Sequence, residues 1–546
     1  MASRKAQLAI GLAVILLTAV VFRAWNLDWG LPQEFHPDEP LVVPRAVGAV
    51  VDGEWNPHYF LVPSLQTGVT SVAYGILYTG GRISGKFKSS GDFGQWAANN
   101  NTVLFLIGRG LSVFFGLVVV FASMLFAGEI LRSSEKLRDG PLLLYGPVIA
   151  GIIAAVSPLM ITSSRFITPD MPMLAFFVLT LWTVVRAVRV GSARLLLLAG
   201  LFAGLAVSSK YSAAILVIPI VTGLFMIQGK GKGNAVGSLF GVIGMMALGF
   251  LAGTPYALLD FSTFIQHLQI QYIQQHEGHL GMERAGLTSL HMLHGLIVNE
   301  GYVFLAAGIA GLVIVWMKFR SQFWLLVPIM VLYLIEISRW TVYADRYLLP
   351  ALPITAVLIG VGSATILNGL KNRIVGIVVL IVITALVAVP QVITSVESGA
   401  ALGLPDTRTI ALEWVEEGIE PGSRILLELG GPQPADANKE FHREPSYDVM
   451  VLPPAFSETS QGMDPISILM LTSPEYVITS SNYRDRYENN YARERFPDLT
   501  ASWTAYYEYL DTRMEVVLEL SAEDDGDGGK VVGPGIIIYQ SLNDYQ

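Results

Sequence analysis

Apolar residues gather along this chain into long runs that short polar segments separate. A helix that crosses a bilayer needs about 20 consecutive, mostly apolar residues. Runs of about this length occur at 7–25, 102–130, 143–163, 170–188, 195–209, 211–228, 234–252, 297–317, 322–338, 347–368 and 374–392. This pattern predicts an α-helical polytopic membrane protein with about 11 to 13 transmembrane helices. The first run follows the basic start "MASRK" but lacks a small-residue cleavage site, so we expect it to be retained as a helix.

A weaker run at 63–80 is rich in Gly, Ser and Thr, and basic residues decide whether it crosses. Short cytoplasmic loops are enriched in Lys and Arg. If 63–80 does not cross, one side of the membrane carries "MASRK", "LRSSEKLRDG", "RAVRVGSAR", "QGKGKG", "MKFR" and "LKNR". We therefore expect 26–101 to be one long outer loop with membrane-lying segments, although Arg82, Lys86 and Lys88 then lie outside. The N-terminus is cytoplasmic in this topology, and the C-terminus lies outside a plasma membrane.

The last part of the chain, 395–546, is more polar than the rest and alternates strand-like with helical segments. The helical segment is "DTRTIALEWVEEG", and the strand-like ones are "RILLEL", "YDVMVL", "EYVITSS", "MEVVLEL" and "GIIIY". This alternation predicts a small soluble α/β domain on the outer face, after a transmembrane domain at 1–394.

Composition supports this division and excludes nucleic acid as a partner. Of the 546 residues 52% are hydrophobic and 14% are charged, whereas soluble proteins have roughly a quarter charged. The net charge is -9 and the basic residues form only small clusters, which does not suit phosphate backbones. The chain has no cysteine, so a disulfide framework and thiolate metal sites are excluded.

Isolated ionisable residues fall at the outer ends of the predicted spans. Near hydrocarbon such groups are functional candidates, since each is costly to bury without a partner. Their joint presence on one face predicts a polar cleft there, and they are Asp38, Glu39, Arg165, Asp170, Lys210, Asp260, Asp345 and Arg346. Structural roles remain open for each alone: Asp38 could cap a short helix, Arg165 and Asp170 could pair, Lys210 could reach the interface, and Arg346 could anchor a helix start.

Metal binding is a further hypothesis. His276 and His279 in "HEGHLGMERAG" are spaced unlike the HExxH of zinc proteases, and they could equally be solvated or contact a substrate. Adjacent carboxylates such as Asp38 and Glu39 suit a divalent cation, Mg²⁺ or Mn²⁺. No metal ligand is assigned.

Seven short motifs follow one another in an order that resembles a known family. They are "HPDE", "NPHYFLVPSL", "IGRGLSVFFG", "SPLMITSSRFITPDMPM", "SSKYSA", "DRYLLPALP" and "DTRTIALEWVEEGIEPGSRI". In this succession, over most of its length, the chain resembles the bacterial and archaeal protein O-mannosyltransferase-like group within the GT-C superfamily of polyprenyl-phosphate-sugar-dependent glycosyltransferases.

The resemblance implies a GT-C fold and an inverting transfer from a sugar on a polyprenyl phosphate, presented at the outer leaflet. Asp38 matches the family's catalytic acid position, Glu39 the acidic residue after it, and Asp170 the acidic residue of the second outer loop. The basic residues Arg165, Lys210 and Arg346 are candidates for binding the phosphate. His58, Tyr347 and His279 complete the candidate substrate-binding set.

The implied chemistry suits these residue types. A carboxylate within reach, Asp38, would take the proton of an acceptor hydroxyl as it attacks C1 of the sugar, and nearby cations would stabilise the leaving phosphate. Glu39 would orient Asp38 or bind a metal ion. The acceptor could be a protein, a lipid or a glycan. The alternatives are a polymerase or ligase of lipid-linked glycans, and a transporter or flippase of lipid-linked sugars, which would place charges nearer the membrane midplane.

Overall fold

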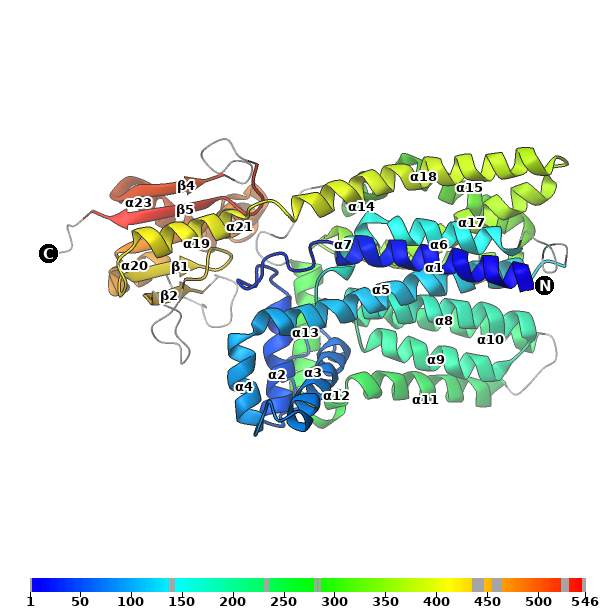
Figure 1. The fold of residues 1–546 in the computed structure, drawn as a ribbon, viewed down its shortest axis with the longest axis horizontal. Helices are drawn as coiled ribbons and strands as arrows, with labels where there is room; N and C mark the ends of the chain where they lie inside the picture. The colour runs from blue at the N-terminus through cyan, green and yellow to red at the C-terminus, as the bar shows by residue number, and fades with distance from the viewer. Residues whose placement is uncertain are drawn as a thin grey trace.

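The chain, in a computed structural model, forms an elongated molecule with a helical bundle at one end and a small sheet domain at the other (Figure 1). The structure describes residues 2–135, 137, 143–229, 235–278, 282, 286–434, 446–453, 464–521 and 530–542. The N-terminus lies at the end of the bundle far from the sheet domain (Figure 1). The other end of the bundle is called the domain end below.

Apolar helices, most of which run along the long axis, make up the bundle (Figure 1). They are α1 (Ala2–Ala24), α5 (Asn101–Leu131), α6 (Tyr145–Val156), α7 (Pro158–Ser164), α8 (Asp170–Val190), α9 (Ala193–Val207), α10 (Val217–Gln228), α11 (Ala235–Gly253), α14 (Thr288–Glu300), α15 (Tyr302–Lys318), α16 (Arg320–Ser338), α17 (Ala351–Gly369) and α18 (Arg373–Ala401). The 3₁₀ turns η3 (Tyr211–Leu216) and η4 (Asp345–Leu348) precede α10 and α17.

The predicted spans are confirmed as helices. Six of the described helices are long and apolar enough to cross a membrane, and two helix pairs bent at a short break also pass together. Three shorter apolar helices, at Ala9–Ala24, Ala193–Val207 and Gly237–Gly253, cover the remaining predicted runs. Each of the predicted apolar runs therefore lies on one of these helices or bent pairs, as expected for a polytopic membrane protein.

Two predicted spans are broken rather than straight. The run at 143–163 bends by 59° between α6 and α7, where Pro158 follows Ser157 and cannot continue the backbone ladder of α6. The run at 297–317 bends by 107° between α14 and α15, at Gly301, whose φ of 90° lies outside the helical region. A Pro or a Gly thus stands at each break.

Close packing holds the bundle together where small residues meet. A Cβ atom at Gly204 of α9 would overlap the backbone of α11, and one at Gly249 of α11 would overlap the backbone of α9. Helices in a membrane associate chiefly through such close contacts, because hydrocarbon gives no solvent-driven force between them. The helices α5, α8 and α17 are largely enclosed, with α5 packed against α6, α8 and α17.

The segment between α1 and α5 forms helices that run across the bundle axis at the domain end (Figure 1). These are α2 (Val43–Val51), α3 (Leu65–Ile83) and α4 (Ser90–Asn99), preceded by the turn η1 (Glu39–Leu41). The helix α13 (Phe261–Glu277), which follows the short α12 (Tyr256–Leu259), also runs across the bundle axis in this view. The weak run at 63–80 is thus the helix α3, and it is not among the candidate spans of the described residues.

The C-terminal domain is a five-stranded mixed sheet covered by helices. Its strand order is β2-β1-β3-β5-β4, with β1, β2 and β3 parallel and β5 antiparallel to β3 and β4. All five predicted strands are present: β1 (Arg424–Glu428), β2 (Asp448–Leu452), β3 (Tyr476–Ser480), β4 (Met514–Leu520) and β5 (Ile536–Ser541). The helices are α19 (Thr407–Gly418), α20 (Pro465–Thr472), α21 (Ser481–Glu488), α22 (Asn490–Arg495) and α23 (Pro497–Arg513). The preceding helix α18 continues past the expected boundary at 394 to Ala401.

Candidate active site

A cavity of about 650 Å³ opens at the domain end of the bundle, and we call it the central cavity. The first loop, the start of α8, the turns η3 and η4 and the helix α13 all contribute to its lining. Five of the residues singled out from the sequence lie in its wall: Asp38, Asp170, Lys210, Arg346 and Tyr347. The cavity therefore brings together four of the eight ionisable residues predicted to form a polar cleft, and Tyr347 lies with them.

Asp38 stands opposite a cation. Its Oδ2 accepts a hydrogen bond from Nη1 of Arg346 at 2.6 Å. Asp38 precedes η1, but its carboxylate caps no backbone N–H there, so the capping role that the sequence left open is not seen. Burial acts to lower the pKa of Arg346, yet the carboxylates of Asp38 and Asp170 outweigh it and hold that pKa above its ordinary value. The guanidinium thus stays charged and fixes one oxygen of Asp38.

A second ion pair lies in the same wall. Asp170 begins α8 and is buried, and its Oδ1 accepts from Nζ of Lys210 at 2.6 Å. The partner of Asp170 is therefore Lys210 and not Arg165, and Lys210 points into the cavity rather than to the surface. The ring of Tyr347 lies 5.0 Å from this ammonium group, a distance that allows a cation–π contact.

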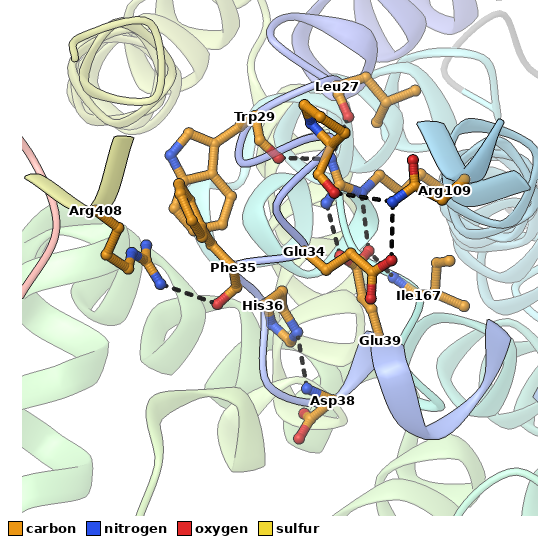
Figure 2. Close-up of polar contacts among 12 residues, drawn as sticks. Leu27, Trp29, Glu34, Phe35, His36, Asp38, Glu39, Arg109, Ile167 and Arg408 are labelled. Carbon is orange, nitrogen blue, oxygen red and sulfur yellow. Dashed lines mark hydrogen bonds and ion pairs between the residues drawn. The ribbon is translucent and has the colours of Figure 1, made fainter. Parts of the chain in front are cut away.

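Glu39 lies outside the cavity wall and is locked in the protein interior (Figure 2). Its two carboxylate oxygens accept from Nε and Nη2 of Arg109 at 2.8 and 2.6 Å, and the amide of Ile167 donates to Oε1 at 3.0 Å. Arg109 also donates to the carbonyls of Leu27 and Trp29. The side chains of Glu39 and Arg109 are fully buried, so this pair joins the first loop to α5 and to the loop before α8.

His36 and Arg408 hold the backbone next to Asp38 (Figure 2). The amide of Asp38 donates to Nδ1 of His36 at 3.2 Å, and Arg408 donates to the carbonyl of Phe35 at 3.1 Å. Burial lowers the pKa of His36 below its ordinary value, although the carboxylates of Asp38 and Glu39 act in the opposite direction. A neutral imidazole has a free nitrogen lone pair, which is what the accepting Nδ1 requires.

Of the candidate substrate-binding residues that the structure describes, Arg165 and His58 do not reach the wall of the central cavity. Arg165 is buried and donates from Nη2 to the carbonyl of Phe22 at the end of α1, which turns its guanidinium away from the cavity. His58 is exposed and contacts Asp260, so it ties the first loop to α13. His279 lies outside the described residues.

The described residues do not offer a ready donor set for a metal ion. No group of three or more His, Asp or Glu side chains suited to a metal is found among them. The carboxylates of Asp38 and Asp170 each accept from a cation, and those of Glu39 accept from Arg109. A divalent cation at Asp38 and Glu39 would have to displace both ion pairs.

Sequence reasoning missed two arginines. Arg109 lies within the "IGRGLSVFFG" motif, and a charge inside an apolar span is itself a signal of a buried partner. Arg45, on α2, lines the central cavity but stands in a segment without any apolar run to mark it. Its position could not have been found without the packing of the first loop.

Part of the chain is similar to a known protein family. Residues 145–267 match the model of the family "Dolichyl-phosphate-mannose-protein mannosyltransferase". No curated protein sequence matches the chain significantly.

Three solved structures share the fold. ArnT from Cupriavidus metallidurans is similar in the apo state, at a TM-score of 0.55 and 14% identity, with 98% of both chains covered. The same protein bound to undecaprenyl phosphate gives a TM-score of 0.55 at 13% identity, again with 98% of both chains covered. The oligosaccharyltransferase of Archaeoglobus fulgidus, in a complex with Zn and sulfate, gives a TM-score of 0.51 at 11% identity and covers 87% of this chain and 69% of that one.

Proposed function

Because residues 145–267 match a mannosyltransferase family and the chain shares the fold of ArnT, we propose that it is a GT-C glycosyltransferase that transfers a sugar from a polyprenyl-phosphate donor to an acceptor hydroxyl, with inversion at the anomeric carbon. The reaction takes place at the outer face of the plasma membrane, which is the domain end of the bundle. The observation that carries this proposal is the position of Asp38 in the central cavity, opposite Arg346.

Asp38 acts as the general base. Its Oδ2 is engaged by Arg346, and its carboxylate can take the proton of the acceptor hydroxyl through the remaining oxygen. The acceptor oxygen forms the new bond to C1 as the bond from C1 to the phosphate oxygen breaks, and the electron pair of that bond goes to the phosphate. One displacement inverts C1 and needs no covalent glycosyl-enzyme. The products are the glycosylated acceptor, the free polyprenyl phosphate and the proton on Asp38.

Two features support a lipid-linked donor. The central cavity contains the ion pairs of Asp38 and Asp170, and most of the surface that lines it is apolar, which suits a ligand with a polar head and a hydrocarbon chain. ArnT, which shares the fold, has been solved with undecaprenyl phosphate bound. Glu39 has a positioning role in this proposal: its buried contact with Arg109 fixes the backbone next to Asp38, and its side chain does not line the central cavity.

The orientation follows from charge. The basic segments predicted to be cytoplasmic include "RAVRVGSAR", between α8 and α9, and "MKFR", between α15 and α16. Both connections lie at the end of the bundle far from the sheet domain (Figure 1). Positive residues favour the cytoplasmic side, so the central cavity and the C-terminal domain face outward.

The test is an assay of the purified protein in lipid with a panel of polyprenyl-phosphate sugars and crude envelope acceptors. Release of free polyprenyl phosphate is measured for the wild type, for Asp38→Asn and for Asp52→Asn, an exposed acid of the same loop, as a matched control. We expect release with one class of sugar, lost in Asp38→Asn and kept in Asp52→Asn. Normal turnover by a folded Asp38→Asn would refute the assignment of the base.

A further inference from the structure

A second cavity, of about 540 Å³, adjoins the central one, and we call it the side cavity. It lies between α2, α3, α12 and the end of α11. Three residues belong to the wall of both cavities: Arg45, Pro57 and Thr67. A ligand that passes these three residues would therefore occupy both spaces.

The side cavity is mostly apolar, and its rim is exposed. Val69 and Val72 of α3 and Leu259 of α12 contribute to its lining. The side chain of Val72 is 54% exposed and that of Leu259 is 73% exposed, as expected where a protein surface meets hydrocarbon. Apolar side chains thus continue from the exposed rim into the side cavity.

Arg45 is the cation at the boundary between the two cavities. Its Nη1 donates to the carbonyl of Leu41 at 2.6 Å and its Nε to that of Pro57 at 3.2 Å, while Tyr59 lies under the guanidinium at 4.5 Å. These contacts fix the plane of the guanidinium. Among the described residues none accepts a hydrogen bond from its Nη2.

The other cations of the central cavity are already neutralised. Arg346 pairs with Asp38 and Lys210 with Asp170, each at 2.6 Å. Of the cationic side chains that the described residues contribute to this wall, Arg45 alone has no carboxylate within ion-pair distance. Glu54, which also lines the side cavity, is exposed and accepts from the amide of Asn56.

We propose that Arg45 binds the phosphate of the lipid-linked donor and that the side cavity holds the first part of its polyprenyl chain. This inference rests on the proposed function and deepens it. The sugar then extends into the central cavity toward Asp38, and the phosphate lies where the two cavities meet. During transfer the guanidinium of Arg45 stabilises the charge that grows on the phosphate as its bond to C1 breaks.

The experiment measures binding alone, so that it does not depend on an acceptor. The probes are undecaprenyl phosphate, undecaprenol, which lacks the phosphate, and a ten-carbon prenyl phosphate, which lacks most of the chain. Arg45→Met removes the cation, and Arg45→Lys keeps a charge at the same position. Gly68→Leu places a side chain in the side cavity, where a Cβ meets nothing within 4 Å. Gly75→Leu, on the same helix and equally open, lies outside the described cavity walls and is the control.

The wild type is expected to prefer undecaprenyl phosphate over both other probes. Arg45→Met should lose the preference for phosphate over alcohol by about tenfold, the order expected for one charge-assisted hydrogen bond, and Arg45→Lys should recover part of it. Gly68→Leu should lose the preference for the long chain, and Gly75→Leu should keep both. If Arg45 had a purely structural role, Arg45→Met would weaken the binding of all three probes alike.

Two results would overturn the inference: a phosphate preference that survives Arg45→Met, or a chain-length preference that survives Gly68→Leu. Neither result would contradict the proposed function, provided that the wild type binds undecaprenyl phosphate. If the wild type showed no preference for the phosphate or for the long chain, the result would instead contradict the proposal that the donor is lipid-linked.

Discussion

Nη1 of Arg346 lies 2.6 Å from Oδ2 of Asp38, although 308 residues separate the two in sequence. The contact joins the first loop to the turn η4 that precedes α17. It fixes the carboxylate that we propose as the base, and a displacement of about 1 Å can lower a catalytic rate by about 10²-fold.

Arg346→Met should therefore lower turnover by about 10²-fold with little loss of stability. Both side chains are about a third exposed, at 38% and 31%, so the pair contributes at most about 1 kcal/mol to the free energy of unfolding. Turnover and thermal unfolding in the same detergent measure the two effects. If the loss of turnover were accompanied by a marked fall in the unfolding temperature, Arg346 would mainly support the fold.

The pair of Glu39 and Arg109 should behave in the opposite way. Both side chains are fully buried, and removal of one leaves an uncompensated charge in the interior. Arg109→Met is expected to destabilise the protein by about 3–5 kcal/mol, and Glu39→Gln combined with Arg109→Met by less, because the double variant leaves no buried charge. Thermal unfolding of both variants and of Asp38→Asn, which should stay near the wild type, measures the difference. An Arg109→Met variant as stable as the wild type would contradict this account.

Local sequence patterns determine much of this fold. Apolar runs predict the spanning helices because burial in hydrocarbon depends on each residue's own side chain, and alternating patterns predict the strands β1 to β5 for a similar reason. The gathering of Asp38, Asp170, Lys210 and Arg346 was also predictable, since each flanks an apolar run on the same side of the bundle. The break at Gly301 depends on backbone conformation, which an apolar run does not encode.

The pairing of charges could not be predicted from the sequence. Asp170 has Arg165 five positions before it, yet it pairs with Lys210, because α8 and η3 pack against each other while Arg165 turns toward α1. Glu39 and Arg109 likewise meet only through the packing of the first loop on α5. Such choices depend on tertiary contacts between segments distant in sequence, which no local pattern contains.

The C-terminal domain should influence catalysis through Arg408. This residue pairs with Asp406, donates to the carbonyl of Phe35 at 3.1 Å and lies 3.8 Å from the ring of Phe35, three residues before Asp38. Arg408→Met should lower turnover and leave the binding of undecaprenyl phosphate unchanged, because it loosens the loop that holds Asp38. Arg424→Met removes an exposed ion pair with Glu475 in the same domain and is the control. Equal turnover of the two variants would show that the contact with Phe35 is dispensable.

Removal of divalent cations should leave transfer almost unchanged. Asp38 and Asp170 of the central cavity already accept from Arg346 and Lys210, which supply the positive charge that a metal ion would otherwise provide. Turnover after treatment with EDTA is expected to stay within about twofold of the untreated value, since intact ion pairs need no added cation. Restoration of a lost activity by Mg²⁺ or Mn²⁺ would show instead that a metal ion takes part.

The stability of the C-terminal domain should fall as the pH rises, through Glu428. Burial at the end of β1 raises the pKa of this carboxyl to about 8, and the hydrogen bond from the amide of Ser480 opposes the rise only in part. In the unfolded chain the group titrates near its ordinary value of 4.5. The folded state therefore binds the proton more tightly, so its advantage is complete below pH 4.5 and is lost progressively as the pH approaches 8.

The size of this effect is of the order of a few kcal/mol, because each unit of pKa difference corresponds to about 1.4 kcal/mol. Glu428→Gln keeps the shape of the side chain and cannot ionise, so it should flatten the pH dependence and be the more stable protein at pH 8. Thermal unfolding of the two proteins between pH 5 and pH 9 gives the comparison, with identical transitions expected at the acidic end. A difference between them that does not grow with pH would mean that Glu428 titrates near its ordinary value in the folded domain, with its charge stabilised by solvent or by neighbouring hydroxyl groups.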